Sequence, residues 1–151
     1  MKTRVLIYVS VLLFSVTFLL AEDVKKDISK EEFYKYWVGT WINPDLQGSD
    51  WTPQKLVCHV NGTQDRYSKL NMNVITCTHP YTQIEYWNDS EGNIWYKGTA
   101  TCALSTVPVQ EIGKINVSNN TYEQIYYLGT EPLEEWDPDN PKYIHRIYYR
   151  Q

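Results

Sequence analysis

Three histidines and three cysteines are the side chains of this 151-residue chain best suited to binding a transition metal. His59, His79 and His145 could converge on zinc, with Cys58 and Cys77 close by in sequence. However, Cys58 and His59 are adjacent in a predicted strand and must point to opposite faces. We therefore predict three ordinary strand or turn histidines, with no metal site and no cofactor.

Patterns for covalent or acid–base catalysis are also sparse. The chain has no Gly-x-Ser-x-Gly elbow, and none of its cysteines has a recognisable catalytic context. The carboxylates of Glu134, Glu135, Asp137 and Asp139 could in principle act on a glycan, but they fall in a proline-rich turn where solvated charge is the plainer interpretation. We predict that the protein is not an enzyme. A small hydrolase or isomerase would need His145 beside an acid in a pocket.

Aromatic residues make up 15% of the chain, including 13 Tyr and 6 Trp. Their broad faces and polar tips suit a pocket for an amphipathic ligand, or a surface on which sugars stack. They suit equally well the filling of a small barrel, and both interpretations stay open. Trp51, Trp87 and Trp136 lie near predicted turns and could rim a barrel mouth, whereas Trp95 and Lys97 are predicted to be plain surface residues.

The N-terminus is typical of a secretory signal peptide. Lys2 and Arg4 precede an apolar run over residues 5–20, and Ala21 suits the last position before cleavage. The alternative is an uncleaved anchor, but the run is short for a bilayer span. We expect cleavage after Ala21, a secreted or periplasmic protein that no longer spans a membrane, and a single domain over residues 22–151.

Charge argues against a nucleic-acid partner. Loss of Lys2 and Arg4 with the signal peptide takes the formal net charge from −4 to −6. An acidic chain without a basic stripe is repelled by phosphate backbones.

The cysteines are odd in number in a compartment that permits disulfides. At most one intrachain pair can form among Cys58, Cys77 and Cys102. Three small core side chains are equally compatible with the sequence.

One short helix is predicted near the start of the domain. Ser29 and Glu32 have the spacing of a capping box, which predicts a helix over residues 30–36. Phe33, Tyr36 and Trp37 fall on one side of it at three- and four-residue spacing, which gives the helix an apolar face.

The rest of the domain alternates β-rich runs with turn clusters, as in a sandwich or barrel. Asn61-Gly62, residues 89–92 and residues 118–120 supply residues that tolerate positive φ and predict hairpins, while residues 137–141 predict a rigid turn. The predicted strands are 38–43, 55–60, 66–70, 74–78, 83–87, 93–104, 113–117, 122–128 and 143–150.

The run over residues 93–104 shows which face of the sheet is inward. Period-two alternation places Ile94, Tyr96, Gly98, Ala100, Cys102 and Leu104 on one side. By the same parity, Ile84 and Tyr86 face inward from the preceding run. Gly98 and Ala100 either allow close packing or leave space for a ligand.

The order of these features resembles the lipocalin-like (calycin) barrels. Gly39-Thr-Trp41 matches the Gly-x-Trp motif that opens the first strand in that family, where the Trp seals the barrel base under a basic residue from the last strand. Arg150, or failing that Arg146, has that position, and a guanidinium on an indole gains cation–π attraction. The family's middle Thr-Asp-Tyr type segment is not evident, so we expect a divergent, bacterial member. The avidin relatives also share Gly-x-Trp features, but there the spacing is off.

The resemblance implies an all-β, up-and-down antiparallel barrel of about eight to nine strands with a short N-terminal helix. We expect it to bind a small apolar or amphipathic molecule inside, without catalysis. The predicted interior binding residues are Tyr86, Tyr96, Gly98, Ala100 and Tyr127. The alternative is an envelope interaction module with a filled barrel, which binds glycan or protein through surface aromatics.

Overall fold

The structure is a computed structural model, and it describes residues 25–44, 53–68, 74–78, 85–103 and 105–151. The predicted signal peptide, Trp51, His79, Ile84 and Leu104 lie outside the described residues. Within the described part, none of the helices has the length and apolar character needed to cross a membrane.

The described chain contains one helix and ten strands. The helix α2 spans Lys30–Trp37. The strands are β1 (Lys26–Asp27), β2 (Gly39–Ile42), β3 (Pro53–Cys58), β4 (Thr63–Ser68), β5 (Val74–Thr78), β6 (Glu85–Asn88), β7 (Ile94–Cys102), β8 (Val109–Asn116), β9 (Thr121–Leu128) and β10 (Ile144–Arg150).

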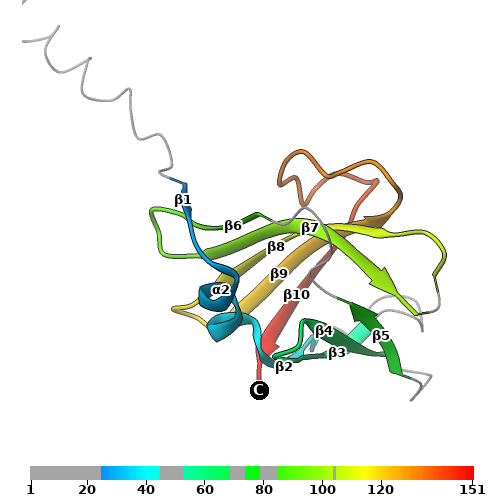
Figure 1. Ribbon diagram of the computed structural model, residues 1–151, viewed down its shortest axis with the longest axis horizontal. Coiled ribbons are helices and arrows are strands. Elements are labelled where there is room, and N and C mark those ends of the chain that lie inside the picture. Colours follow the sequence, from blue (N-terminus) through cyan, green and yellow to red (C-terminus); the bar gives the residue numbers. More distant parts are fainter. Residues whose placement is uncertain (1–24, 45–52, 69–73, 79–84, 104) are drawn as a thin grey trace, which may run out of the picture.

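Eight of these strands close into an antiparallel barrel, which confirms the predicted fold class. The closed circuit runs β2-β3-β4-β5-β7-β8-β9-β10 and returns from β10 to β2. Strand β7 is long enough to serve two neighbours on one edge, pairing with β6 through residues 94–97 and with β5 through residues 101–102. Strand β1 extends the sheet beyond β6 (Figure 1). Each barrel strand pairs with the next along the chain, so the connections are of the up-and-down type once β6 is set aside.

Local sequence explains the helix and its position. The Ser29 hydroxyl accepts a hydrogen bond from the Glu32 backbone amide at 3.1 Å, as the capping pattern predicts. Phe33 and Trp37 are fully buried, so the helix lays its apolar side on the barrel. Figure 1 shows α2 at one end of the barrel, beside β2 and the C-terminal end of β10.

Three predicted turns form as expected. Gly62 and Gly92 take positive φ in the turns that join β3 to β4 and β6 to β7, and Asn120 does so between β8 and β9. Glycine pays no steric penalty there, and Asn tolerates this region better than most residues.

Two strands begin three or four residues earlier than the sequence predicts. Strand β4 starts at Thr63 where residue 66 was expected, and β8 starts at Val109 where residue 113 was expected. Both missed segments place polar side chains at buried positions, including Gln64 and Glu111. Such residues obscure the alternation of apolar and polar side chains from which strands are predicted.

The pairing of the cysteines is decided where β5 and β7 meet in the barrel. Cys77 on β5 and Cys102 on β7 are directly opposite each other and form a disulfide, while Cys58 is a buried free thiol. Of the two possibilities left open by the sequence, the structure therefore has the single bond. The bond joins β7 to β5 just beyond the part of β7 that pairs with β6.

Candidate functional site

One end of the barrel is sealed by the residues of the Gly-x-Trp motif. Trp41 is fully buried, and its indole Nε1 donates to the Trp37 carbonyl at 2.9 Å. The Arg150 guanidinium lies 5.1 Å from the Trp41 ring centroid and donates to the carbonyls of Tyr36 and Val38 at 3.0 and 2.7 Å. The backbone at Gly39 passes so close that an added Cβ would stand 3.1 Å from Arg150.

Arg150, and not Arg146, is thus the basic residue over Trp41. Arg146 lies two inward-facing positions of β10 further from this end of the barrel, level with Gln124 on β9 and Gly113 on β8. It belongs to the barrel interior.

The interior above this seal contains a buried polar cluster that sequence analysis missed. Arg66 on β4 and Glu111 on β8 form an ion pair at 3.4 Å with side chains that are 7% and 0% exposed. Gln124 donates to the same Glu111 oxygen at 2.8 Å, and Arg66 Nε donates to Gln64 at 2.8 Å. Burial is the largest influence on the pKa of Arg66 and would lower it, but the Glu111 carboxylate and the nearby tyrosines Tyr126, Tyr148 and Tyr122 together outweigh burial and raise that pKa.

Tyrosines surround this cluster. The hydroxyls of Tyr96 and Tyr122 are 2.5 Å apart, and burial, reinforced by the charge of Glu111, raises the pKa of both phenols well above the usual value. Both therefore stay neutral at physiological pH. Their hydroxyls can act as donors as well as acceptors.

On the inward face of β10, two buried polar atoms have no hydrogen-bond partner among the described residues. They are the hydroxyl of Tyr148, whose side chain is fully buried, and Nε of Arg146. Tyr148 and Arg146 occupy adjacent inward positions of β10. Buried polar groups are normally paired, so this side of the interior is incomplete as a hydrogen-bonding environment.

Three of the five predicted interior residues lie on the inward side of β7. Tyr96 and Ala100 are fully buried on the inward face of β7, with Gly98 between them. Tyr86 packs instead against the helix, with its ring centroid 4.7 Å from that of Phe33.

The placement of Tyr127 in the interior is corrected. Tyr126 is the inward residue of β9 and packs with Cys77, Ala100 and Val109. Tyr127 lies on the outer face, where its ring is paired with that of Tyr143 and its hydroxyl donates to the Glu131 carbonyl. Adjacent residues of a strand point to opposite faces, and the two neighbouring tyrosines carry no local sign of which one is inward.

The outer face of β7, β8 and β9 carries a second apolar cluster. Ile112 on β8 and Ile125 on β9 are buried there, packed with Leu133 from the segment that joins β9 to β10. Trp95 and Trp136 pack against them. The prediction that Trp95 is a plain surface residue is therefore corrected, because this segment folds back over it.

Three tryptophans line a cleft of about 200 Å³ beside this cluster, together with Lys25 and Asp89. The rings of Trp87 and Trp95 are nearly parallel, with centroids 5.9 Å apart, and Trp136 stands edge-on to Trp95 at 5.2 Å. These tryptophans come from two strands and a loop, and they form a cleft on the outside of the barrel.

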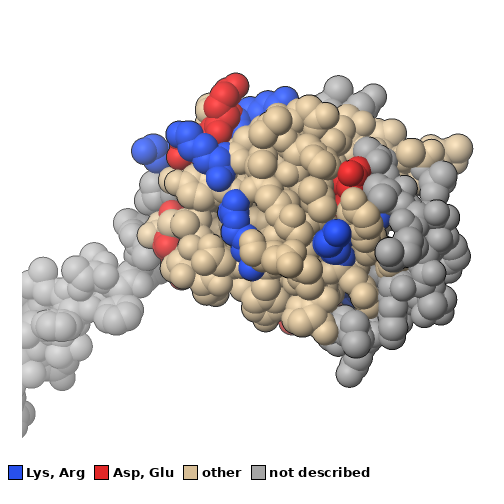
Figure 2. Space-filling model, turned by 90° about the horizontal axis from the view of Figure 1, so that it is seen from below, with Lys and Arg blue, Asp and Glu red and all other residues tan. Residues whose placement is uncertain are grey.

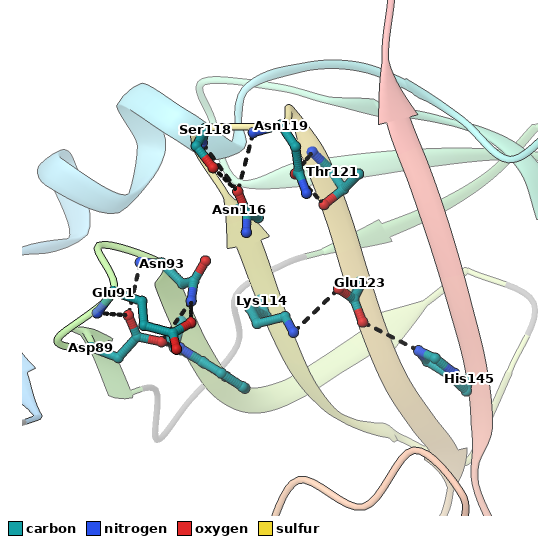
Figure 3. A network of polar contacts seen from close by, with 11 residues as sticks. Asp89, Glu91, Asn93, Lys114, Asn116, Ser118, Asn119, Thr121, Glu123 and His145 are labelled. Carbon is teal, nitrogen blue, oxygen red and sulfur yellow. Dashed lines mark hydrogen bonds and ion pairs between the residues drawn. The ribbon is translucent and has the colours of Figure 1, made fainter. Parts of the chain in front are cut away.

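Asp89 fixes the turn at one side of the cleft. Its carboxylate accepts hydrogen bonds from Trp95 Nε1 at 2.7 Å, from the backbone amides of Glu91 and Asn93, and from the Asn93 side chain (Figure 3). Partial burial opposes ionisation, but the hydrogen bonds from Trp95 and Asn93 prevail and lower the pKa of Asp89. At neutral pH the carboxylate is therefore a charged acceptor held in a fixed orientation.

The two described histidines are separate from each other. His59 pairs with Asp65 at 3.0 Å, and His145 with Glu123 at 3.6 Å; Glu123 also contacts Lys114 (Figure 3). Among the described residues, His, Cys, Asp and Glu form no group of three that could hold a metal ion.

Charged side chains are mixed in sign. On the face drawn in Figure 2, basic and acidic groups lie next to each other near one edge, and a broad uncharged area separates them from the rest.

The closed eight-stranded barrel is consistent with a calycin-like barrel. No protein-family model, curated protein or solved structure matches the chain.

Proposed function

We propose that this chain is an exported, lipocalin-like carrier that binds a small amphipathic molecule in the barrel interior without chemical change. The observation that supports it is the polar cluster of Arg66 and Glu111, with the unpartnered donors of Arg146 and Tyr148 beside it.

A barrel that needed only stability would have apolar side chains at these positions. Burying charges is costly, and an ion pair such as Arg66 with Glu111 stabilises a fold no better than well-packed apolar residues do. Polar groups placed between apolar walls are typical of ligand sites, where they orient the ligand. The apolar part of the ligand would contact Ala100 and Tyr126.

The two unpartnered atoms also define the polar end of the ligand. Arg146 Nε can only donate, and the Tyr148 hydroxyl can donate as well. A head group with acceptor oxygens, such as a carboxylate, would satisfy both. The two arginines outnumber the one carboxylate of the cluster, so the interior charge also favours an acceptor-rich or anionic head.

The test is a titration of the mature protein with 1-anilinonaphthalene-8-sulfonate, followed by displacement with palmitate. Tyr148→Phe removes only an unpartnered hydroxyl, so stability should hold while affinity for the dye or palmitate falls about five- to tenfold, the equivalent of ~1–1.4 kcal/mol. Gly98→Leu should also weaken binding by filling the interior.

Tyr149→Phe is the matched control, because Tyr149 is the next residue on β10 and is 48% exposed. It should bind as the parent does. A folded parent that binds neither dye nor palmitate, or a Tyr148→Phe variant with unchanged affinity, would contradict the proposal.

A further inference from the structure

The outer cleft of Lys25, Trp87, Asp89, Trp95 and Trp136 lies on the opposite side of the sheet from the polar cluster of the interior. Trp87 and Trp95 are direct partners across β6 and β7, and both rings point outward. Nothing in the carrier function uses them. An aromatic cleft of this kind on the outside of a barrel is a separate candidate site.

The tryptophan rings that line the cleft are held in place before any ligand arrives. The Asp89 carboxylate holds Trp95 through its indole nitrogen. The Lys114 ammonium lies 5.5 Å from the Trp95 ring centroid and 5.4 Å from that of Trp136. The Lys25 ammonium lies 4.1 Å from the Trp87 centroid. Rings that are already ordered lose little side-chain entropy on binding.

The segment that carries Trp136 is also anchored. Leu133 is 2% exposed and packs against Ile112 and Ile125 on the outer face of the sheet. Trp136 itself contacts the His145 ring edge-on at 6.0 Å. The third wall of the cleft is thus supported by strands β8 to β10.

The charges around the cleft balance. Lys25 pairs with Glu85 at 2.8 Å, and Lys114 pairs with Glu123 at 3.2 Å. A cationic ligand would meet ammonium groups already placed against the rings, and an anionic ligand would find each lysine already paired. A purely apolar ligand would strip water from the Lys25 ammonium without replacing the lost hydrogen bonds.

A neutral saccharide fits all of these conditions. Its ring has an apolar C–H face for the indoles, and its hydroxyls both donate and accept. The cleft is smaller than the ~300–1,000 Å³ of sites for drug-sized ligands, which suits the end of a chain. We propose that this cleft binds the terminal ring of a neutral oligosaccharide, with Trp87 and Trp136 as stacking surfaces and Lys25 as hydrogen-bond donor to a sugar hydroxyl, while Asp89 holds Trp95 in place.

The experiment is a calorimetric titration of the mature protein with maltotriose, cellotriose and chitotriose, repeated by tryptophan fluorescence. At least one trisaccharide should bind saturably and change the emission. Trp87→Ala should weaken that binding at least about tenfold. Trp136→Ala provides a second, independent change in the loop, and circular dichroism reports whether each variant folds.

Two controls locate the binding. Tyr149→Ala removes an exposed aromatic ring from β10, outside the cleft, and should leave the affinity unchanged. The trisaccharide should not displace 1-anilinonaphthalene-8-sulfonate, because the interior is on the other side of the sheet. If the folded protein binds none of the three sugars, or if binding survives both tryptophan variants or displaces the dye, the proposal is overturned.

Discussion

At the scale of single residues, the ion pair of Arg66 and Glu111 is the least expected feature of the chain. The two residues are 45 positions apart, and both are almost completely buried. Burying these two charges reduces the stability of the fold, which has a functional reason if the interior binds a polar head group. The fold should also be sensitive to the loss of either partner, because the remaining charge would be buried alone.

Arg66→Met should therefore lower the free energy of unfolding by about 3–5 kcal/mol, because it leaves the Glu111 charge buried without its ion-pair partner. The double variant Arg66→Met with Glu111→Leu should recover most of that loss. Urea unfolding at neutral pH measures both. A single variant as stable as the parent would show that water or another donor compensates Glu111.

The hydrogen-bonded carboxylate of Asp89 should make the free energy of unfolding depend on pH in the acid range. A carboxylate whose pKa is lowered in the folded state stabilises the fold above the unfolded value of 3.8, and this contribution disappears as pH falls through the lower folded pKa. Urea midpoints measured from pH 6 down to pH 2.5 should fall less steeply below pH 4 for Asp89→Asn than for the parent. Identical slopes would mean that the hydrogen bonds to Asp89 do not depend on its charge.

At the scale of elements, the contact between β7 and β8 depends on a glycine. Tyr96 and Gly113 are opposite each other, and the Tyr96 ring covers the glycine so closely that a Cβ there would clash with it. The same ring then reaches the Tyr122 hydroxyl. One glycine therefore gives Tyr96 the room to cross the interior.

Gly113→Ala should destabilise the protein by about 1–3 kcal/mol through this overpacking. In a Tyr96→Leu background the shorter side chain should relieve the clash, so the added cost of Gly113→Ala should largely vanish. A double-mutant cycle from urea unfolding gives the coupling. Equal costs in the two backgrounds would assign the effect to the backbone instead.

At the scale of the whole molecule, closure of the barrel depends on the seam between β5 and β7. Among the described residues, two pairs join these strands in the ladder, and the Cys77–Cys102 disulfide links one of them. Next to this short seam, β7 pairs with β6. The bond thus secures the least extensively paired junction of β7 in the barrel.

Reduction of that bond, or Cys77→Ala with Cys102→Ala, should lower the free energy of unfolding by about 3–4 kcal/mol, as a disulfide separated by 25 residues would predict. Urea unfolding with and without a phosphine reductant measures it. Cys58→Ala is the control and should keep the full response to reductant. An unchanged midpoint on reduction would mean that β5 is held by its pairing with β4.

The sequence by itself determined the features that arise from neighbouring residues. The Ser29 cap, the turns at Gly62 and Gly92 and the period-two face of β7 are local, so residue type and spacing were sufficient to predict them. The Gly39 and Trp41 motif and the terminal Arg150 also pointed to an all-β barrel with a sealed end.

Only the tertiary structure decided which residues meet. It selected Tyr126 over Tyr127 for the interior, paired Cys77 with Cys102, and brought Arg66 to Glu111. It also folded the segment of Trp136 over Trp95. These outcomes depend on the register between strands and on closure of the barrel, which are set by packing across the whole sheet and leave no mark in any single strand.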